Sequence, residues 1–273
     1  MRVAMSMLAA AAVVMSSAVG AKEPPVARAT SGWQVDFGDQ RCLAMRQYDV
    51  AGQVVVFAIE PDPNGLGARL TFRIDDSREK VGLGWRKAQL TVGRRELDDR
   101  VSVIPGLARG ALILGGYRIK HGEAQPLSGA QPLTLRSTAL TATLPLGPID
   151  RINALLAECN AGLLDSWGFS RAEQARIGTM PQGEVRPGTG SWDYPPDAAR
   201  DRLSGEVSVR YWVDTRGKAS DCQLRRSSGV ASLDRATCRF VNERVRFTPA
   251  KDKAGRPMAV IDTARVRWVA PEH

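Results

Sequence analysis

The chain has 273 residues, of which 43% are apolar and 25% are charged, and its formal net charge is +9. This composition is typical of a folded protein and excludes a disordered chain, a collagen-like repeat and a multispan membrane protein. The presence of only two histidines and four cysteines excludes a histidine-rich metal site. At about 150 residues per domain, the length predicts two domains.

The first 21 residues have the layout of a secretory signal peptide. A positive start at Met1-Arg2 precedes an uncharged apolar run over Met5–Ala18, and small residues follow at Val19-Gly20-Ala21. The pattern predicts export with cleavage after Ala21. The alternative is a retained inner-membrane anchor, although the run is shorter than the about 20 apolar residues that one bilayer crossing needs.

Residues 31–167 are predicted to form a β-rich domain of unknown role that one helix closes. Apolar residues at spacings of three and four between Ile149 and Trp167 indicate the helix. Pro148 suits its first turn, and Gly168 lies near its end. Asp62-Pro63-Asn64-Gly65 is a strong turn signal between two strands. The β-like runs lie at Trp33–Phe37, Cys42–Tyr48, Gln53–Ile59, Ala68–Ile74, Gln89–Val92, Arg100–Ile104 and Leu133–Leu140.

Residues 168–190 are predicted to be a linker, because glycine and proline interrupt them and apolar residues are sparse. Even fully extended, this segment reaches only about 80 Å. It is therefore far shorter than a spacer that crosses the periplasm.

Residues 191–273 predict a second domain of α+β class, with a small antiparallel sheet and two helices. The expected elements are a short helix at Tyr194–Arg200, a strand at Glu206–Val213, a hairpin turn at Asp214–Gly217, a strand at Lys218–Arg226, a helix around Leu233–Val241 and a last strand at Met258–Val269. The first strand alternates strictly, with Val207, Val209, Tyr211 and Val213 on one face and Glu206, Ser208, Arg210 and Trp212 on the other.

The cysteines of an exported chain meet an oxidising compartment, where disulfides form. Four cysteines allow three pairings. The domain boundary leaves two cysteines in each half, which favours Cys42–Cys159 and Cys222–Cys238. A zinc site is the alternative, but the chain has no C-x-x-C motif and no histidine near the cysteines.

The C-terminal region resembles the C-terminal domain of the TonB energy-transducer family over about residues 191–269. The matching residues are Tyr194-Pro195, Gly205, Val213-Asp214, Gly217, Ser227-Ser228-Gly229, Leu233-Asp234, Phe247-Thr248-Pro249-Ala250, Gly255 and Pro257. The resemblance implies a periplasmic domain that grips outer-membrane receptors. In that family an extended receptor segment pairs with an exposed strand, and an inner-membrane motor supplies force.

By this resemblance, the receptor-pairing edge is expected in the last strand, with Tyr194 and Pro195 near the contact. The residues predicted to bind a partner are Tyr194, Pro195, Val260, Asp262, Ala264, Arg265, Val266, Arg267 and Trp268. The alternative interpretation is a plain amphipathic strand, protected at the sheet edge by its arginines.

The chain departs from a full transducer in its cleavable signal and in the folded domain where a long spacer is expected. The sequence therefore predicts a periplasmic binding protein that engages an outer-membrane receptor or another envelope protein by strand addition, with a link to energy-coupled transport implied by the family. The alternative is a structural or self-association module, a homodimer formed through exposed strands. Neither hypothesis involves nucleic acid or a membrane span after signal cleavage.

No enzymatic activity and no cofactor are predicted. The chain contains no G-x-x-x-x-G-K-[ST], G-x-G-x-x-G, H-E-x-x-H or G-x-S-x-G motif. His121 lies next to cations, which favours a surface loop over a general base. Arginines flank the carboxylate pairs Asp75-Asp76 and Asp98-Asp99, which favours solvated charge over catalysis.

Overall fold

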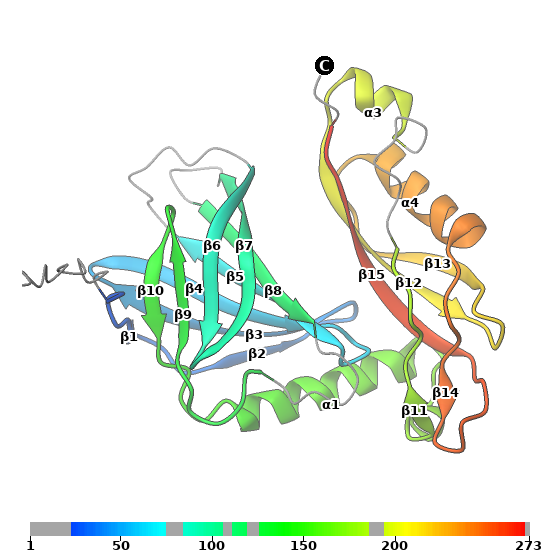
Figure 1. Cartoon of the computed structure of the whole chain (residues 1–273), viewed down its shortest axis with the longest axis horizontal. Coiled ribbons are helices and arrows are strands. Elements are labelled where there is room, and N and C mark those ends of the chain that lie inside the picture. Colours follow the sequence, from blue (N-terminus) through cyan, green and yellow to red (C-terminus); the bar gives the residue numbers. More distant parts are fainter. Residues whose placement is uncertain (1–22, 75–83, 106–110, 119–125, 186–193, 271–273) are drawn as a thin grey trace, which may run out of the picture.

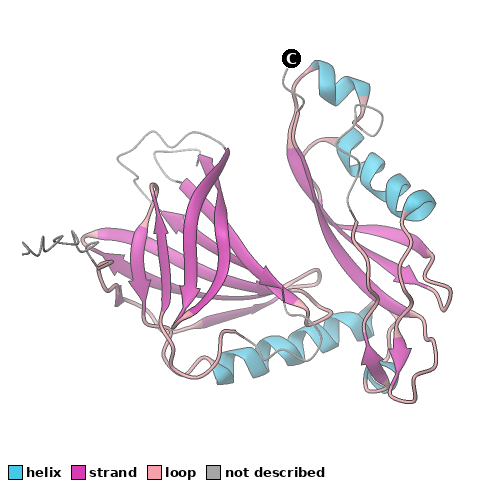
Figure 2. Cartoon of the chain, in the orientation of Figure 1, coloured by secondary structure: helices cyan, strands magenta, loops and turns pink. Residues whose placement is uncertain are grey.

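The computed structural model describes residues 23–74, 84–105, 111–118, 126–185 and 194–270 (Figure 1). It has mostly antiparallel sheets and a few helices, which confirms the mixed α+β class (Figure 2). The predicted signal peptide, the pair Asp75-Asp76 and His121 lie outside the described residues. Within the described ranges, no helix combines the length and apolar character that a membrane crossing needs.

The N-terminal sheet has the strand order β1-β3-β4-β5-β8-β7-β6-β9-β10, and β2 also pairs with β3. Between β5 and β9, the strands β8, β7 and β6 follow one another in the reverse of their order in the sequence. The strands are β1 (Arg28–Ala29), β2 (Gln34–Phe37), β3 (Cys42–Val50), β4 (Gln53–Pro61), β5 (Gly67–Ile74), β6 (Gly84–Val92), β7 (Arg95–Pro105), β8 (Ala111–Arg118), β9 (Leu133–Ser137) and β10 (Thr141–Leu144).

This sheet curls until its two ends meet (Figure 1). Thr143 in β10 donates its N–H to the carbonyl of Pro25 at 2.8 Å and accepts from the N–H of Ala27 at 2.8 Å. Alternate side chains of the strands point inward, as the period of two requires. Phe57 and Phe72 lie opposite each other in β4 and β5, are fully buried, and have ring centroids 5.0 Å apart. The closed sheet therefore encloses its own core.

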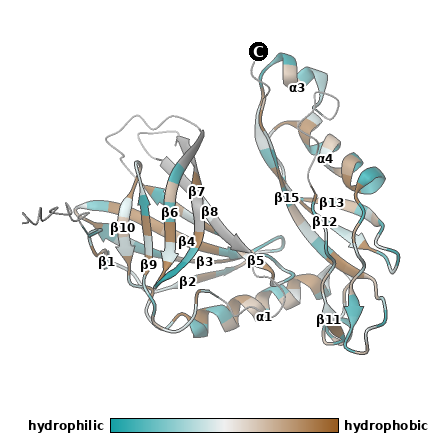
Figure 3. Ribbon diagram, viewed as in Figure 1, coloured by the Kyte–Doolittle hydropathy of each residue, from teal (hydrophilic) through white to brown (hydrophobic). Residues whose placement is uncertain are grey.

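Helix α1 (Asp150–Ser166) lies across one end of this sheet (Figure 1). Hydrophobic and hydrophilic residues alternate along it, as Figure 3 shows, and Leu156, Cys159 and Leu163 join the core of the sheet. The disulfide Cys42–Cys159 ties the helix to β3, with Cα atoms 6.0 Å apart. The sequence predicted both this helix and this pairing.

The segment predicted as a linker has secondary structure of its own. It forms α2 (Arg171–Gln174) and β11 (Ile177–Thr179), and β11 pairs with β14 (Lys251–Asp252). Phe169 is 1% exposed in the core of the C-terminal domain. The boundaries at residues 167 and 190 stay a prediction.

The C-terminal sheet has only three strands, in the order β13-β12-β15. Its elements are α3 (Pro196–Arg200), β12 (Gly205–Val213), β13 (Ala219–Arg226), α4 (Ala231–Arg244) and β15 (Val260–Trp268). Helix α4 packs on one face, against the predicted row of Val207, Val209, Tyr211 and Val213. The second predicted disulfide, Cys222–Cys238, ties β13 to α4. The face opposite α4, called the open face below, points toward the N-terminal domain (Figure 1).

Candidate protein-binding edge

Strand β15 is an edge strand of the C-terminal sheet. It pairs with β12 along its whole length, from Val213 opposite Val260 to Gly205 opposite Trp268, and within the described residues no strand pairs with its other side. The N–H of Thr263 donates to the carboxylate of Asp262 at 2.8 Å, which indicates that it points away from β12. Since N–H directions alternate along a strand, the N–H groups of Arg265 and Arg267 point outward as well.

The side chains of β15 divide between the two faces of the sheet. Residues opposite the buried row of β12 face α4, and Val266 and Trp268 are 2% and 4% exposed there. Arg265 and Arg267 lie opposite Ser208 and Glu206, on the open face. A partner strand paired with β15 would therefore meet main-chain groups at the edge and arginines on one side.

The other edge of the sheet, β13, is tied to α4 at one position. The N–H of Cys222 donates to the side chain of Asn242 in α4 at 3.2 Å. The disulfide Cys222–Cys238 holds the same part of β13 against that helix. The pairing of β13 with β12 also shifts register twice, whereas that of β15 is regular. Because bulges protect an edge from further pairing, β15 is the better candidate for strand addition.

Tyr194 lies at one end of β15, and its role in binding a partner stays a prediction, as does that of Pro195. The Tyr194 ring meets the edge of Trp268, with ring centroids 5.4 Å apart and planes at 85°. Its hydroxyl donates to the carbonyl of Leu203 at 2.5 Å, and burial raises its pKa. Pro195 is buried at the N-terminal boundary of α3. These residues position the end of the strand.

The turn between β4 and β5 reaches from the N-terminal domain to the edge of β15. The Asn64 side chain donates to the Asp262 carboxylate at 2.6 Å, on the same oxygen that accepts from Thr263. Burial is the main cause of a raised pKa at Asp262, and the nearby Asp62 adds to it, while hydrogen bonds from Asn64, Thr263 and Tyr211 act the other way. The Asp262 carboxylate thus caps one edge N–H of β15, and the turn holds that carboxylate through Asn64.

A group of ion pairs joins the same two domains on the open face. Arg265 lies 2.8 Å from the Asp62 carboxylate and 3.6 Å from that of Glu60. Glu60 also pairs with Arg226 of β13 at 3.1 Å and is 5% exposed. Burial opposes ionisation of Glu60, yet the surrounding arginines hold its pKa below the ordinary value. Arg69 of β5 pairs with Glu206 of β12 in the same interface.

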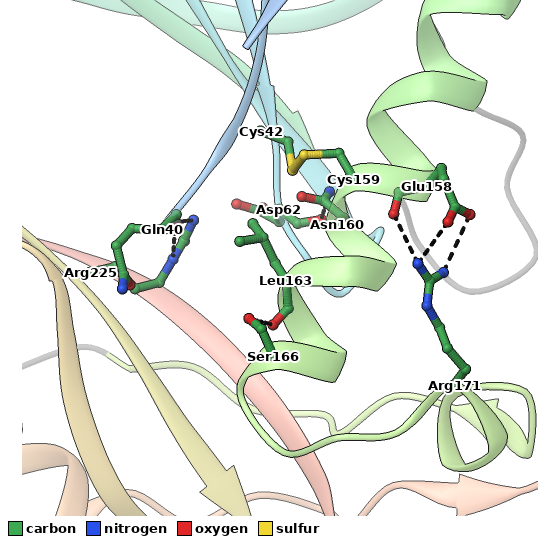
Figure 4. The surroundings of a disulfide bond; sticks show 10 residues. All are labelled: Gln40, Cys42, Asp62, Glu158, Cys159, Asn160, Leu163, Ser166, Arg171 and Arg225. Carbon is green, nitrogen blue, oxygen red and sulfur yellow. Dashed lines mark hydrogen bonds and ion pairs between the residues drawn. A yellow bond between two sulfur atoms is a disulfide. The ribbon is translucent and has the colours of Figure 1, made fainter. Parts of the chain in front are cut away.

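Arg225 anchors the far side of this interface. Its guanidinium donates twice to the carbonyl of Gln40, at 2.6 and 2.9 Å (Figure 4), and lies 5.4 Å from the centre of the Trp167 ring. Burial lowers its pKa to about 10, and Glu60 partly offsets that effect. Arg210 lies over the same ring at 4.8 Å. Figure 4 also shows the Cys42–Cys159 disulfide close by.

The sequence missed the N-terminal half of this site. It identified the Asp62–Gly65 turn, but nothing local indicates that Asn64 contacts Asp262, 198 residues later. The sequence also contains no pattern that predicts an acidic contact surface, because Glu60 is the only charged residue in a mostly apolar strand. The structure brings Asp262 and Arg265 against the other domain, while the binding role of these residues stays a prediction.

Comparison with known families places the C-terminal part of the chain. Residues 191–269 match the family model described as Gram-negative bacterial TonB protein C-terminal. These residues form a TonB-type C-terminal domain. The match supports a TonB-like family of envelope proteins, whose domain acts in energy transduction and protein interaction rather than in catalysis. No curated protein and no solved structure is significantly similar to the chain.

Proposed function

We propose that the chain is a periplasmic protein whose TonB-type domain binds an extended segment of an outer-membrane receptor or another envelope protein by strand addition to β15. The observation that carries this proposal is the outer side of β15, which no strand of the described residues pairs with, in a domain that matches the TonB family model. Main-chain hydrogen bonds supply affinity in such pairing and tolerate many partner sequences. The two disulfides support an oxidising location.

The link to energy-coupled transport rests on the family and on no contact within this chain. The N-terminal domain is proposed to be a second recognition module that replaces a spacer. Self-association through β15 is the competing proposal, because the same edge can pair with its copy in a second chain.

The test uses the full chain and extended peptides from the N-terminal segments of outer-membrane receptors, with binding measured by calorimetry. Arg267→Pro removes an outward N–H from the edge but leaves the ladder to β12, since proline is tolerated on edge strands. The matched variant Arg267→Ala keeps that N–H and removes the side chain with its charge. We expect Arg267→Pro to lose at least about tenfold in affinity, the equivalent of one charge-assisted or two ordinary hydrogen bonds, and Arg267→Ala to lose less.

Equal binding by both variants and the unaltered chain would argue against pairing at β15. Absence of peptide binding, where an authentic transducer domain binds, would overturn the receptor proposal. A symmetric dimer in light scattering that Arg267→Pro converts to monomer would support self-association instead. Circular dichroism of both variants shows whether the sheet is retained.

A further inference from the structure

The open face of the TonB-type domain is strongly cationic where it meets the N-terminal domain. By register, Arg226 of β13 lies opposite Ser208, and Ser208 lies opposite Arg265 of β15, so the two arginines share this face. Arg225, beside a register shift, reaches the same interface. Three arginines from two strands thus surround Ser208, whose hydroxyl is buried without a hydrogen-bond partner.

Two carboxylates from one short segment of the N-terminal domain form ion pairs with Arg226 and Arg265. Glu60 and Asp62 are spaced two residues apart at the end of β4, so both contact Arg265, and Glu60 also pairs with Arg226. The Asp62 carbonyl in turn accepts from Asn160 of α1 at 3.3 Å, which holds the stretch in place. An extended acidic segment is therefore what the open face already binds within this chain.

The same stretch continues over the outer edge of β15. Asp262 has its side chain toward α4, on the opposite face from Arg265, and Asn64 donates to it. Residues 60–64 therefore contact side chains on both faces of β15, and Asn64 holds the carboxylate that caps the edge N–H of Thr263. A strand added along the full length of β15 needs the space that this turn fills.

We propose that Glu60, Asp62 and Asn64 act as an internal occupant of the binding edge, and that the partner which displaces them is an extended segment with acidic side chains. This inference rests on the proposed function. Displacement of Glu60 and Asp62 takes both carboxylates from Arg265, whose side chain is 18% exposed, and one from Arg226. This loss is costly unless the incoming segment supplies new carboxylates. A neutral segment gains the main-chain bonds but leaves the arginines unpaired.

The internal occupant is linked to its site, so its effective concentration is high and a free peptide binds only the undocked fraction of the chain. The contacts between the domains are mainly ion pairs and hydrogen bonds, as in interfaces that open transiently. Salt screens such contacts where they are exposed to solvent. Docking therefore lowers the apparent affinity for every partner and favours acidic ones.

The experiment compares the full chain with the double variant Glu60→Gln/Asp62→Asn, which keeps the shape and removes both charges. Glu158→Gln is the matched control, because Glu158 pairs with Arg171 on the exposed side of α1. Two peptides serve as probes: one with glutamates at alternate positions and the same peptide with glutamine at those positions. Hydrogen exchange over residues 260–268 reports docking without any peptide.

We expect faster exchange at Thr263 in the double variant and an affinity for the acidic peptide at least about tenfold higher than in the unaltered chain or Glu158→Gln, because the undocked fraction rises. The glutamine peptide should bind each protein more weakly. Equal affinity of the acidic peptide for all three proteins would overturn the competition, while strand addition would stand. Binding of neither peptide to any of them, with exchange still faster, would instead count against the proposed function.

If the double variant does not fold, Asn64→Ala tests the same point, since it removes the contact at the edge and leaves the ion pairs. Faster exchange at Thr263 with tighter peptide binding supports the inference. Unchanged exchange and unchanged binding overturn it.

Discussion

The two sheets of this chain treat their edges differently. The N-terminal sheet curls until β10 meets the segment at Pro25–Ala27, so its end strands satisfy each other. The three-stranded C-terminal sheet stays open, with β13 tied to α4 and β15 contacted by the β4–β5 turn. In a closed sheet, the main-chain N–H and C=O groups of the end strands bond within the fold. In an open sheet, those of an edge strand remain available for another strand. The N-terminal sheet thus uses its ends within the fold, while β15 has no partner strand on its outer side among the described residues.

The covalent ties of the two domains differ as well. Cys42–Cys159 closes a separation of 117 residues in the sequence, and Cys222–Cys238 closes one of 16 residues. In the chain-entropy view a longer closed loop stabilises the folded state more. Both ties join a strand to a helix, but only the first encloses most of a domain.

The largest expected effect is the loss of the first disulfide. Cys42→Ala/Cys159→Ala should lower the free energy of unfolding by about 4–5 kcal/mol, and Cys222→Ala/Cys238→Ala by about 3 kcal/mol. Urea denaturation of each double variant, followed by circular dichroism, measures both. A larger loss from the second pair would show that packing at the open sheet, and not loop length, sets the order.

The next effect concerns the turn that joins β12 to β13. Gly217 has φ of 79°, and a Cβ there would lie 1.8 Å from the Phe247 carbonyl oxygen. Gly217→Ala should therefore destabilise the chain by about 3 kcal/mol or more. Gly229 has φ of 84° with open space around it, so Gly229→Ala should cost only about 1 kcal/mol. Similar losses in thermal denaturation would contradict the role of the close contact.

The smallest effect separates two carboxyl groups of the interface by pH. The lowered pKa of Glu60 means that it stabilises the folded state above pH about 4.3, and this contribution disappears as the pH falls through the folded pKa. The raised pKa of Asp262 has the opposite sign: its ionised form costs stability at neutral pH, and the cost falls as the pH approaches about 3.9.

At pH 7, Glu60→Gln should therefore destabilise by about 2 kcal/mol. Asp262→Asn should stabilise the folded state, because the buried side chain then carries no charge that burial disfavours. Both differences should shrink toward pH 3.5 when unfolding is followed at a series of pH values. A stabilising Glu60→Gln would show that burial outweighs the arginines.

The sequence predicted much of the local structure. Alternation placed β12 with its buried row, periods of three and four placed α1 and α4, and the division of cysteines gave both disulfides. It missed β8 and β10 in the closed sheet, and it missed α2, β11 and β14 near the C-terminal domain. The short elements carry too few residues for a period to emerge, and the pairing of β5 with β8 crosses two intervening strands.

The candidate binding edge likewise has features that the local sequence predicts and features that only the tertiary structure shows. That β15 is a strand, with Tyr194 near its end, follows from local pattern and family motif, because both depend on residues close together in the sequence. That Asn64 meets Asp262, and that Glu60 pairs with Arg226 and Arg265, depends on the closed sheet and α1 presenting one turn to the other domain. Periodicity and motif record which face of an element is buried. Only the tertiary structure determines which side chains, nearly 200 residues away in the sequence, contact that face.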